Sequence, residues 1–400
     1  MKITEIATKA LVKSFMKNVS DQTFTLKFLD GEDFKIGEGE SKFTMIINKF
    51  PDKKKLFNNA SVALGEAYVN GDIDFIGNTQ DIIESMIKNK NSFFHENKLL
   101  TILKKFKSIS KSNSKEDIAY HYDIGNDFYS LWLDKTMSYS CAYFKTETDS
   151  LEDAQLNKID HILKKLNLKE GQKLLDIGCG WGNLVIEAAK KYHVNALGIT
   201  LSEAQFKKAK KRIKEEGLEN LIEIKLMDYR DLAKINLQFD RVVSVGMAEH
   251  VGKTNLPLFF NIVNKVLKDE GLFLLHNITT LVESTGDGWI LKYIFPGGYI
   301  PTLKEELYAA NNFDFHTIDV ESLRLHYMKT LMNWRDKFEN NVEAISKMFD
   351  EKFIRMWRLY LNSCAAAFHY GDIDLHQILF SKGLNNNLPW TRSYLYNTKN

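Results

Sequence analysis

The sequence has little of several features that mark specialised protein classes. Only three of its 400 residues are cysteines, at positions 141, 179 and 364, and no two of them form a CxxC pair. This spacing argues against a disulfide framework and against a structural zinc site, and it suits a reducing compartment. No metal is expected.

Long apolar runs and a strong charge imbalance are also missing. No uninterrupted apolar run approaches the ~18 residues that a membrane-spanning helix needs, and the first ten residues lack the apolar stretch of a signal peptide. We therefore expect a cytoplasmic protein. The formal net charge is only +2, so no nucleic-acid partner is indicated, and local basic clusters must meet any anionic ligand.

What the sequence does contain is the composition of a folded protein with two domains. The apolar fraction of 44% and the charged fraction of 26% lie near globular averages. A length of 400 residues exceeds the usual size of a single core. Residues 108–117 are polar and rich in serine, which is typical of a linker. We expect an N-terminal domain over 1–107, the linker at 108–117, and a larger second domain over 118–400.

The N-terminal region has the patterns of a small α+β domain. Apolar Phe24, Leu26 and Phe28 alternate with polar neighbours, and Asp30-Gly31 then predicts the turn of a β-hairpin. Another strand is expected at 42–50, and helical spacing is found at 61–69, 79–88 and 97–107.

The second domain alternates strands with helices. Strands are expected at 173–177, 194–199, 222–226, 241–245 and 272–276. Intervening helices require crossover connections, which predicts a doubly wound α/β fold whose mostly parallel sheet is covered on both faces. Residues 375–381 and 388–394 are expected to add an antiparallel edge hairpin, giving seven strands.

A glycine-rich turn follows the first strand of this sheet. It reads Leu-Leu-Asp-Ile-Gly-Cys-Gly-Trp-Gly over 174–182, at the strand edge where open α/β sheets bind nucleotides. The turn lacks the P-loop Lys-Ser/Thr pair and the GxGxxG spacing, so it is not an obvious phosphate cradle. Glycine spacing alone leaves open a purely structural role in a tight strand-to-helix turn.

As a whole string, the turn resembles motif I of class I S-adenosylmethionine-dependent methyltransferases. In that motif an acidic residue ends the strand, here Asp176, and the glycines pass under the methionine portion of the cofactor. Most of that superfamily also carries Asp or Glu at the end of the second strand, where this sequence has Thr200. Ser202 and Gln205 fit a helix capping box, a cofactor role, or both.

The Thr-Leu-Ser-x-x-Gln string at 200–205 is similar to that of cyclopropane-fatty-acyl-phospholipid synthases and their mycolic-acid relatives. The similarity extends along the chain and is carried by the strings at 139–144, 228–231, 244–252, 274–276 and 293–298. The string at 64–71 resembles the small first domain of the bacterial phospholipid enzymes, which the mycolic-acid enzymes lack.

The resemblance implies a transferase that moves a methylene from S-adenosylmethionine to the cis double bond of an unsaturated phospholipid acyl chain. The products are a cyclopropane ring and S-adenosylhomocysteine. It also implies a homodimer and reversible peripheral contact with the inner face of the cell membrane. Two alternatives stay open: a fatty-acyl or small-molecule methyltransferase that stops at a methyl or methylene branch, and a non-catalytic lipid-binding protein.

The family's residues carry over to matching positions. The base in the family is a bound bicarbonate ion, and its implied ligands here are Cys141, Glu249, His276, Ile278 and Tyr327. The implied cofactor residues are Tyr139, Ser140, Asp176, Gly178, Gly180, Thr200, Gln205, Asp228, Tyr229 and Arg230, with Asp228 and Tyr229 near the adenine. Taken alone, Cys141 also fits a small buried core residue and His276 a core histidine that ends a strand.

Two basic segments are candidates for anionic partners. Residues 97–107 combine an apolar stripe with four lysines, which fits contact with anionic lipid headgroups, although such a stripe also packs on its own domain. The basic run at 207–214 is expected to be the solvated face of a helix.

Overall fold

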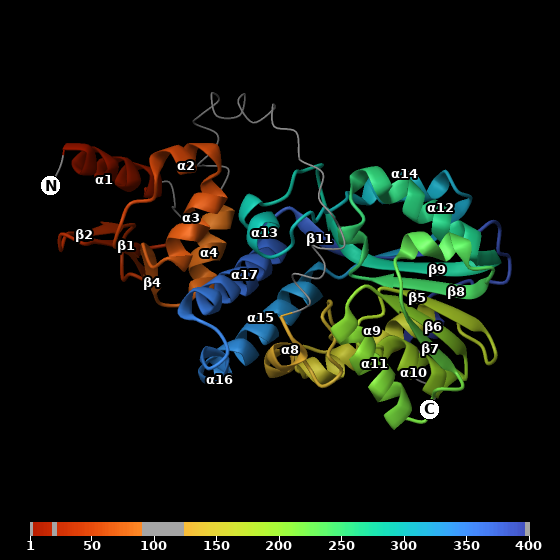
Figure 1. Cartoon of the computed structure of the whole chain (residues 1–400). Coiled ribbons are helices and arrows are strands. Elements are labelled where there is room, and N and C mark those ends of the chain that lie inside the picture. The colour runs from red at the N-terminus through yellow and green to blue at the C-terminus, as the bar shows by residue number, and fades with distance from the viewer. Residues whose placement is uncertain (1–2, 18–21, 90–123, 397–400) are drawn as a thin grey trace. The chain divides into compact units, whose positions relative to one another are not determined.

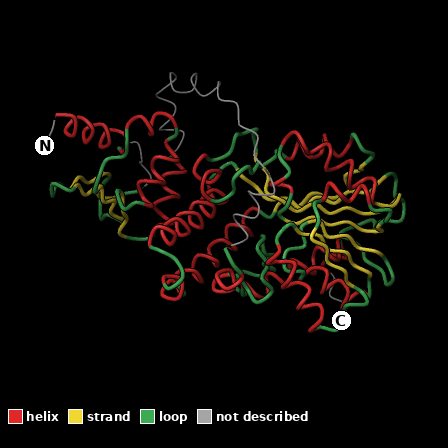
Figure 2. The backbone as a smooth tube through the Cα atoms, in the orientation of Figure 1, coloured by secondary structure: helices red, strands yellow, loops and turns green. Residues whose placement is uncertain are grey.

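The computed structural model describes residues 3–17, 22–89 and 124–396 (Figures 1 and 2). The expected helix at 97–107 and the expected linker at 108–117 lie outside the described residues. The chain divides into two compact units, and the first contains the described residues before position 90 together with Asp287–Ile294 and Phe338–Gly371.

The first unit is built on a four-stranded sheet in the order β2-β1-β3-β4. Its strands are β1 (Phe24–Phe28), β2 (Asp33–Ile36), β3 (Phe43–Ile47) and β4 (Ile73–Ile76). The predicted hairpin is confirmed, because β1 and β2 pair antiparallel across a turn in which Gly31 has a φ of +83°. Alternate residues of β1 are buried, as the apolar pattern predicts.

Helices from both ends of the sequence complete this unit. They are α1 (Ile3–Met16), α2 (Lys53–Asn58), α3 (Ala60–Val69), α4 (Thr79–Lys88), α13 (Gly288–Tyr293), α16 (Val342–Ser346) and α17 (Glu351–Tyr370). Helix α17 packs beside α3 and α4 (Figure 1). On it, Arg355 donates through Nε to the carbonyl of Tyr68 at 2.7 Å and through Nη2 to that of Ile73 at 3.0 Å. The unit therefore includes later segments that the linear division assigned to the catalytic domain.

The second unit contains the seven-stranded sheet, in the order β10-β11-β9-β8-β5-β6-β7. Its strands are β5 (Lys173–Ile177), β6 (Asn195–Thr200), β7 (Ile222–Leu226), β8 (Phe239–Val245), β9 (Leu267–Thr280), β10 (Phe315–Ser322) and β11 (Ile373–Lys382). The pairs among β5 to β9 are parallel, and β11 runs antiparallel between β9 and β10. The predicted doubly wound, mostly parallel sheet is confirmed.

Helices cover both faces of this sheet (Figure 1). On one side lie α9 (Leu151–Lys165), α10 (Asn183–Tyr192) and α11 (Glu203–Glu215), and on the other lie α12 (Leu256–Val266) and α14 (Leu303–Asn311). Leu174 and Leu175 of β5 are fully buried in separate core clusters on the two faces of the sheet. Both faces therefore need helices to cover them. Helices α8 (Asn126–Trp132), α15 (Arg324–Asn340) and α18 (Ser393–Tyr396) complete the described elements of α-helix.

The predicted edge hairpin needs a correction. An antiparallel pair does lie at the edge of the sheet, but it consists of β10 and β11, and residues 388–394 form no strand. Both hydrogen-bonding sides of β11 are already occupied by β9 and β10, so a strand returning after Gly383 cannot pair with β11. The strand at 315–322 escaped prediction because most of its residues are partly or fully exposed.

None of the described helices has both the length and the apolar character required to span a membrane.

Candidate active site

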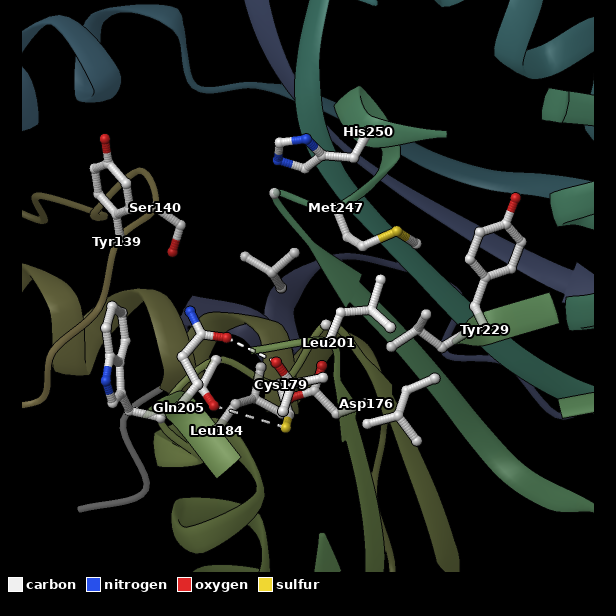
Figure 3. Close-up of a pocket in the computed structure, with 18 of the residues that line it drawn as sticks. Tyr139, Ser140, Asp176, Cys179, Leu184, Leu201, Gln205, Tyr229, Met247 and His250 are labelled. Carbon is white, nitrogen blue, oxygen red and sulfur yellow. Dashed lines mark hydrogen bonds between the residues drawn. The ribbon is translucent and has the colours of Figure 1, made fainter. Parts of the chain in front are cut away.

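A pocket opens at the carboxyl ends of the parallel strands in the second unit (Figure 3). This is the edge where the sequence pattern placed the cofactor. The structure brings all ten predicted cofactor residues into the lining of this one pocket: Tyr139, Ser140, Asp176, Gly178, Gly180, Thr200, Gln205, Asp228, Tyr229 and Arg230.

The glycine turn after β5 forms the floor of the pocket. The backbone N–H groups of Gly178 and Cys179 both donate to the carbonyl of Ile199 on β6, at 3.0 and 2.9 Å. Gly178 has a φ of +90°, and a Cβ there would lie 3.0 Å from the side chain of Met247. The turn therefore requires glycine both for its backbone conformation and for the close approach of Met247.

Asp176 ends β5 as a buried carboxylate that lines the pocket, and its Oδ1 has no hydrogen-bond partner in the described structure. Burial raises the pKa of Asp176 to about 7, while the charge of Lys158 acts in the opposite direction. An acceptor without a partner, facing a pocket, suits a ligand that brings a cationic donor.

Thr200 and Gln205 occupy the place where most class I methyltransferases have an acidic residue. The hydroxyl of Thr200 donates to Gln205 Oε1 at 2.8 Å. The hydroxyl of Ser202 also accepts the backbone N–H of Gln205 at 3.3 Å, so Ser202 caps α11. Ser202 is therefore the N-cap, but the reciprocal bond of the expected capping box is not made, because the backbone N–H of Ser202 donates to the Thr200 hydroxyl at 3.2 Å. Thr200 and Gln205 line the pocket.

Asp228 and Tyr229 lie at one end of the pocket, and Figure 3 shows Tyr229 across it from Tyr139. The Asp228 carboxylate accepts hydrogen bonds from Arg230, through the backbone N–H and Nε at 2.9 Å each and through Nη2 at 2.6 Å. Tyr229 packs edge-on against Phe259 at a centroid distance of 5.5 Å, and burial raises its pKa to about 12.

Tyr139 and Ser140 come from the loop after α8. The ring of Tyr139 packs against Trp132 and Trp334, each at a centroid distance of 5.3 Å. From α9, Gln155 donates to the carbonyl of Ser140 at 2.9 Å. Helix α9 and the aromatic cluster thus fix the loop that leads into Cys141.

None of the five predicted catalytic residues lines the cofactor pocket itself. Three of them meet beside it at β9, where Glu249 Oε1 accepts the backbone N–H of Ile278 at 2.8 Å and Gly246, in the pocket wall, donates to the carbonyl of His276 at 2.8 Å. His276 and Ile278 are two residues apart on the strand, so they lie on the same face. Burial raises the pKa of Glu249 to about 7, although the Ile278 hydrogen bond lowers it.

Two buried polar atoms in this group lack partners in the described structure, Glu249 Oε2 and His276 Nε2. The amide nitrogen of Gln377 lies 3.1 Å from His276 Nδ1 and can only donate, so the ring proton resides on Nε2. Burial lowers the pKa of His276 well below its usual value, which keeps the ring neutral. The group thus offers one acceptor and one donor.

Cys141 and Tyr327 form a second group along α15. The Cys141 thiol is fully buried, contacts the carbonyl of Leu323 at 3.8 Å, and has its pKa raised by burial. Tyr327 lies one turn further along and packs edge-on against Trp334 at 6.0 Å. The full burial of Cys141 agrees with its interpretation as a small core residue.

Sequence reasoning missed several residues of the pocket wall. Met247 and His250 follow β8, so the rule that selected Glu249 could have found them (Figure 3). Lys158 lies inside α9, where a lysine ordinarily signals a solvated face, but it is only 3% exposed. The run at 207–214 has most of its lysines exposed, as expected of a solvated helix face, but Arg212 turns inward and donates to the carbonyl of Trp181 at 3.1 Å.

The fold and the pocket define a class I S-adenosylmethionine-dependent methyltransferase. Residues 109–378 match the family described as mycolic acid cyclopropane synthetase. The chain therefore belongs to that family. Residues 11–98 match a domain of unknown function, DUF7884.

Two relatives span nearly the whole chain. One is a probable fatty acid methyltransferase of Pseudomonas putida, 38% identical over 93% of this chain and 95% of the relative. The other is a cyclopropane-fatty-acyl-phospholipid synthase of Escherichia coli K12, 40% identical over 85% of this chain and 88% of the relative. A crystal structure of mycolic acid cyclopropane synthase CmaA1 complexed with SAH and CTAB covers 68% of this chain and 99% of its own, with a TM-score of 0.64 and 33% identity.

Proposed function

We propose that this chain converts the cis double bond of unsaturated phospholipid acyl chains into a cyclopropane ring, using S-adenosylmethionine as donor and bound bicarbonate as base. The observation that carries the proposal is the single pocket that gathers all ten predicted cofactor residues, with Glu249 and His276 grouped directly behind its wall. The relative from Escherichia coli is named for this activity.

The donor supplies an electrophilic methyl group, and bicarbonate supplies a base for one of its protons. An alkene is a weak nucleophile, so the protein must hold it in place and exclude water. The side chains of Met247, Leu201 and Val245 line the pocket with apolar surface suited to that task. The aromatic cluster around Tyr139 offers ring faces toward positive charge.

The group at β9 fits bicarbonate on its own chemistry. Bicarbonate carries one hydroxyl donor and two acceptor oxygens, and the group offers Glu249 Oε2 as an acceptor and His276 Nε2 as a donor, both buried and without partners in the described structure. Cys141, Ile278 and Tyr327 are proposed to complete the site. His276 Nε2 can donate to one oxygen of the ion and Glu249 Oε2 can accept its hydroxyl, which leaves the remaining oxygen of the ion free to take the proton.

The test is to incubate the full chain with vesicles of unsaturated phospholipid and S-adenosylmethionine labelled with ¹³C in its methyl group. The proposal expects ring-methylene resonances that carry the label, measured by NMR of the recovered acyl chains. Labelled methyl or methylene branches would instead support a fatty-acyl methyltransferase, which the name of the Pseudomonas putida relative favours. Absence of label would overturn both.

The substrate lies in a bilayer, so we also propose reversible peripheral contact with the inner face of the cell membrane, through the N-terminal region 1–107, and a homodimer. Residues 97–107 are the proposed contact. Co-sedimentation should increase with the anionic lipid content of the vesicles and fall when the lysines at 98, 104, 105 and 107 are replaced by glutamine. Binding that ignores these changes removes the electrostatic contact, and light scattering that gives a monomer mass removes the dimer.

A further inference from the structure

A buried lysine lies where the cofactor pocket meets α9. Lys158 is 3% exposed and lines the pocket, although nothing in the sequence pattern assigned it a role. Taking an ammonium group out of water is costly unless partners or a ligand compensate it. Burial lowers the pKa of Lys158 to about 8, so the charges around it only partly compensate it in this structure.

The one hydrogen bond that the structure gives Lys158 determines the direction of another group. Its Nζ donates to the hydroxyl oxygen of Ser140 at 2.8 Å. An ammonium can only donate, so the Ser140 oxygen accepts and its own proton is free to point elsewhere. Ser140 lines the pocket. Lys158 therefore sets Ser140 as a donor within the pocket and adds a positive charge behind it.

The opposite charge is present in the same pocket. Asp176 lines it as a buried carboxylate with Oδ1 unpartnered in the described structure, and Lys158 acts on it electrostatically. Asp228, the other buried carboxylate of the lining, is already bound by Arg230. A buried cation and a buried carboxylate with an unpartnered oxygen are matched by a ligand that carries both charges close together. The α-amino acid end of S-adenosylmethionine is such a group.

We propose that Lys158 and Ser140 together bind the α-carboxylate of the cofactor, with Lys158 positioning the Ser140 hydroxyl, while Asp176 receives the α-ammonium. The inference rests on the proposed function, because it assumes this donor. Lys158 is then a residue for cofactor recognition. The two buried charges bind opposite groups of the amino acid end, Lys158 the α-carboxylate and Asp176 the α-ammonium.

The experiment compares two ligands by isothermal titration calorimetry. One is S-adenosylhomocysteine and the other is the same molecule with hydrogen in place of the α-carboxylate. In Lys158→Met, affinity for S-adenosylhomocysteine should fall by ~10- to 100-fold, as expected for a charge-assisted hydrogen bond. Affinity for the decarboxylated ligand should change by less than about threefold, because this ligand lacks the carboxylate that Lys158 would bind.

Matched variants separate recognition from folding. Lys164→Met makes the same replacement on α9 at a partly exposed lysine paired with Asp160 at 3.0 Å, and it should bind both ligands as wild type does. Ser140→Ala keeps Lys158 and should show the same preference in part, so the inference stays testable if Lys158→Met misfolds. Equal loss for both ligands, or no loss for either, overturns the inference. Failure of wild type to bind S-adenosylhomocysteine would instead overturn the proposed function.

Discussion

At Glu249, the role of a single carboxylate oxygen can be tested. One of its oxygens is held by Ile278 and the other is free for a ligand in the described structure. Glu249→Gln keeps the shape of the side chain but replaces one acceptor oxygen with a donor, so bicarbonate loses its place. We expect ring formation to fall by ~10²- to 10⁴-fold, the range for a misplaced base, with affinity for S-adenosylhomocysteine within about twofold.

The measurement is the initial rate of label incorporation together with calorimetric binding. Glu219→Gln, at an exposed position, is the matched control and should leave both unchanged. A Glu249→Gln variant with normal turnover would remove Glu249 from the mechanism.

The same residue should make stability depend on pH. The pKa of Glu249 is about 7 in the folded state and near 4.5 when unfolded, so the folded state binds more protons between these values and its stability falls as pH rises through them. A shift of this size corresponds to about 3 kcal/mol. Urea unfolding at pH 5 and pH 8 should therefore show Glu249→Gln gaining up to about 3 kcal/mol over wild type at the higher pH. If the stability difference between Glu249→Gln and wild type is the same at pH 5 and pH 8, the Glu249 carboxyl is solvated.

Lys158 should show the reverse sign. Its pKa is lowered, so the unfolded state binds more protons between about 8 and 10.5, and a cost of about 3 kcal/mol is present at all lower pH values. Lys158→Met should therefore be at least as stable as wild type at pH 7 in the absence of ligand, measured by chemical unfolding. Lower stability there would indicate a structural lysine. A residue that weakens the fold but strengthens binding is typical of a functional site.

At the scale of elements, the sequence pattern predicted the bounds of those strands that depend mainly on neighbouring residues. Strands β5 and β7 begin and end where the sequence placed them, because their buried residues and turn signals lie within the same few positions. The error at the sheet edge arose because the partners of β11 precede it in the sequence: it pairs with β10 and with β9, which lies about a hundred residues earlier, and not with the residues that follow Gly383.

The candidate site likewise contains residues that the sequence could predict and residues that it could not. The cofactor residues sit in turns that the sequence marks, and all ten line the pocket. Lys158 carries no such mark, because only the packing of α9 against the loop at 138–140 distinguishes it from a surface lysine. The contact of Cys141 with Leu323, which comes 182 residues later in the sequence, likewise depends on tertiary packing.

One contact between elements of the first unit can be tested at Gly65 of α3. A Cβ on Gly65 would lie 2.2 Å from the indole of Trp289 on α13. Alanine favours helix by about 1 kcal/mol over glycine, but overpacking typically costs ~1–3 kcal/mol. Gly65→Ala should therefore lower the unfolding free energy by up to about 2 kcal/mol in thermal or urea unfolding. Leu64→Ala, at a 43% exposed neighbour, should change it by less than about 0.5 kcal/mol. A more stable Gly65→Ala would show that α13 does not pack there.

At the scale of the whole molecule, the first unit is discontinuous in sequence. Helix α17 buries Ile354, Trp357 and Leu361, and it packs with α3 and α4. His369 near its end contacts Glu84 of α4 at 3.0 Å. A domain assembled from distant segments cannot be released by one cut in the chain.

This arrangement predicts the behaviour of fragments. A chain of residues 118–400 would retain α17 without the helices that cover it, so we expect it to aggregate or to melt well below the full chain. A chain of residues 1–107 lacks α13 and α17 and should give the circular dichroism of a largely unfolded protein. Mixing the two during refolding should restore a soluble complex, because each supplies the apolar surface that the other exposes.

A fragment of 118–400 that is monomeric and melts like the full chain would show that α17 is stable without α3 and α4. The matched control is the full chain with a protease site inserted within 108–117, which should stay assembled and keep its Tm after cleavage, since all the described helices and strands are still present.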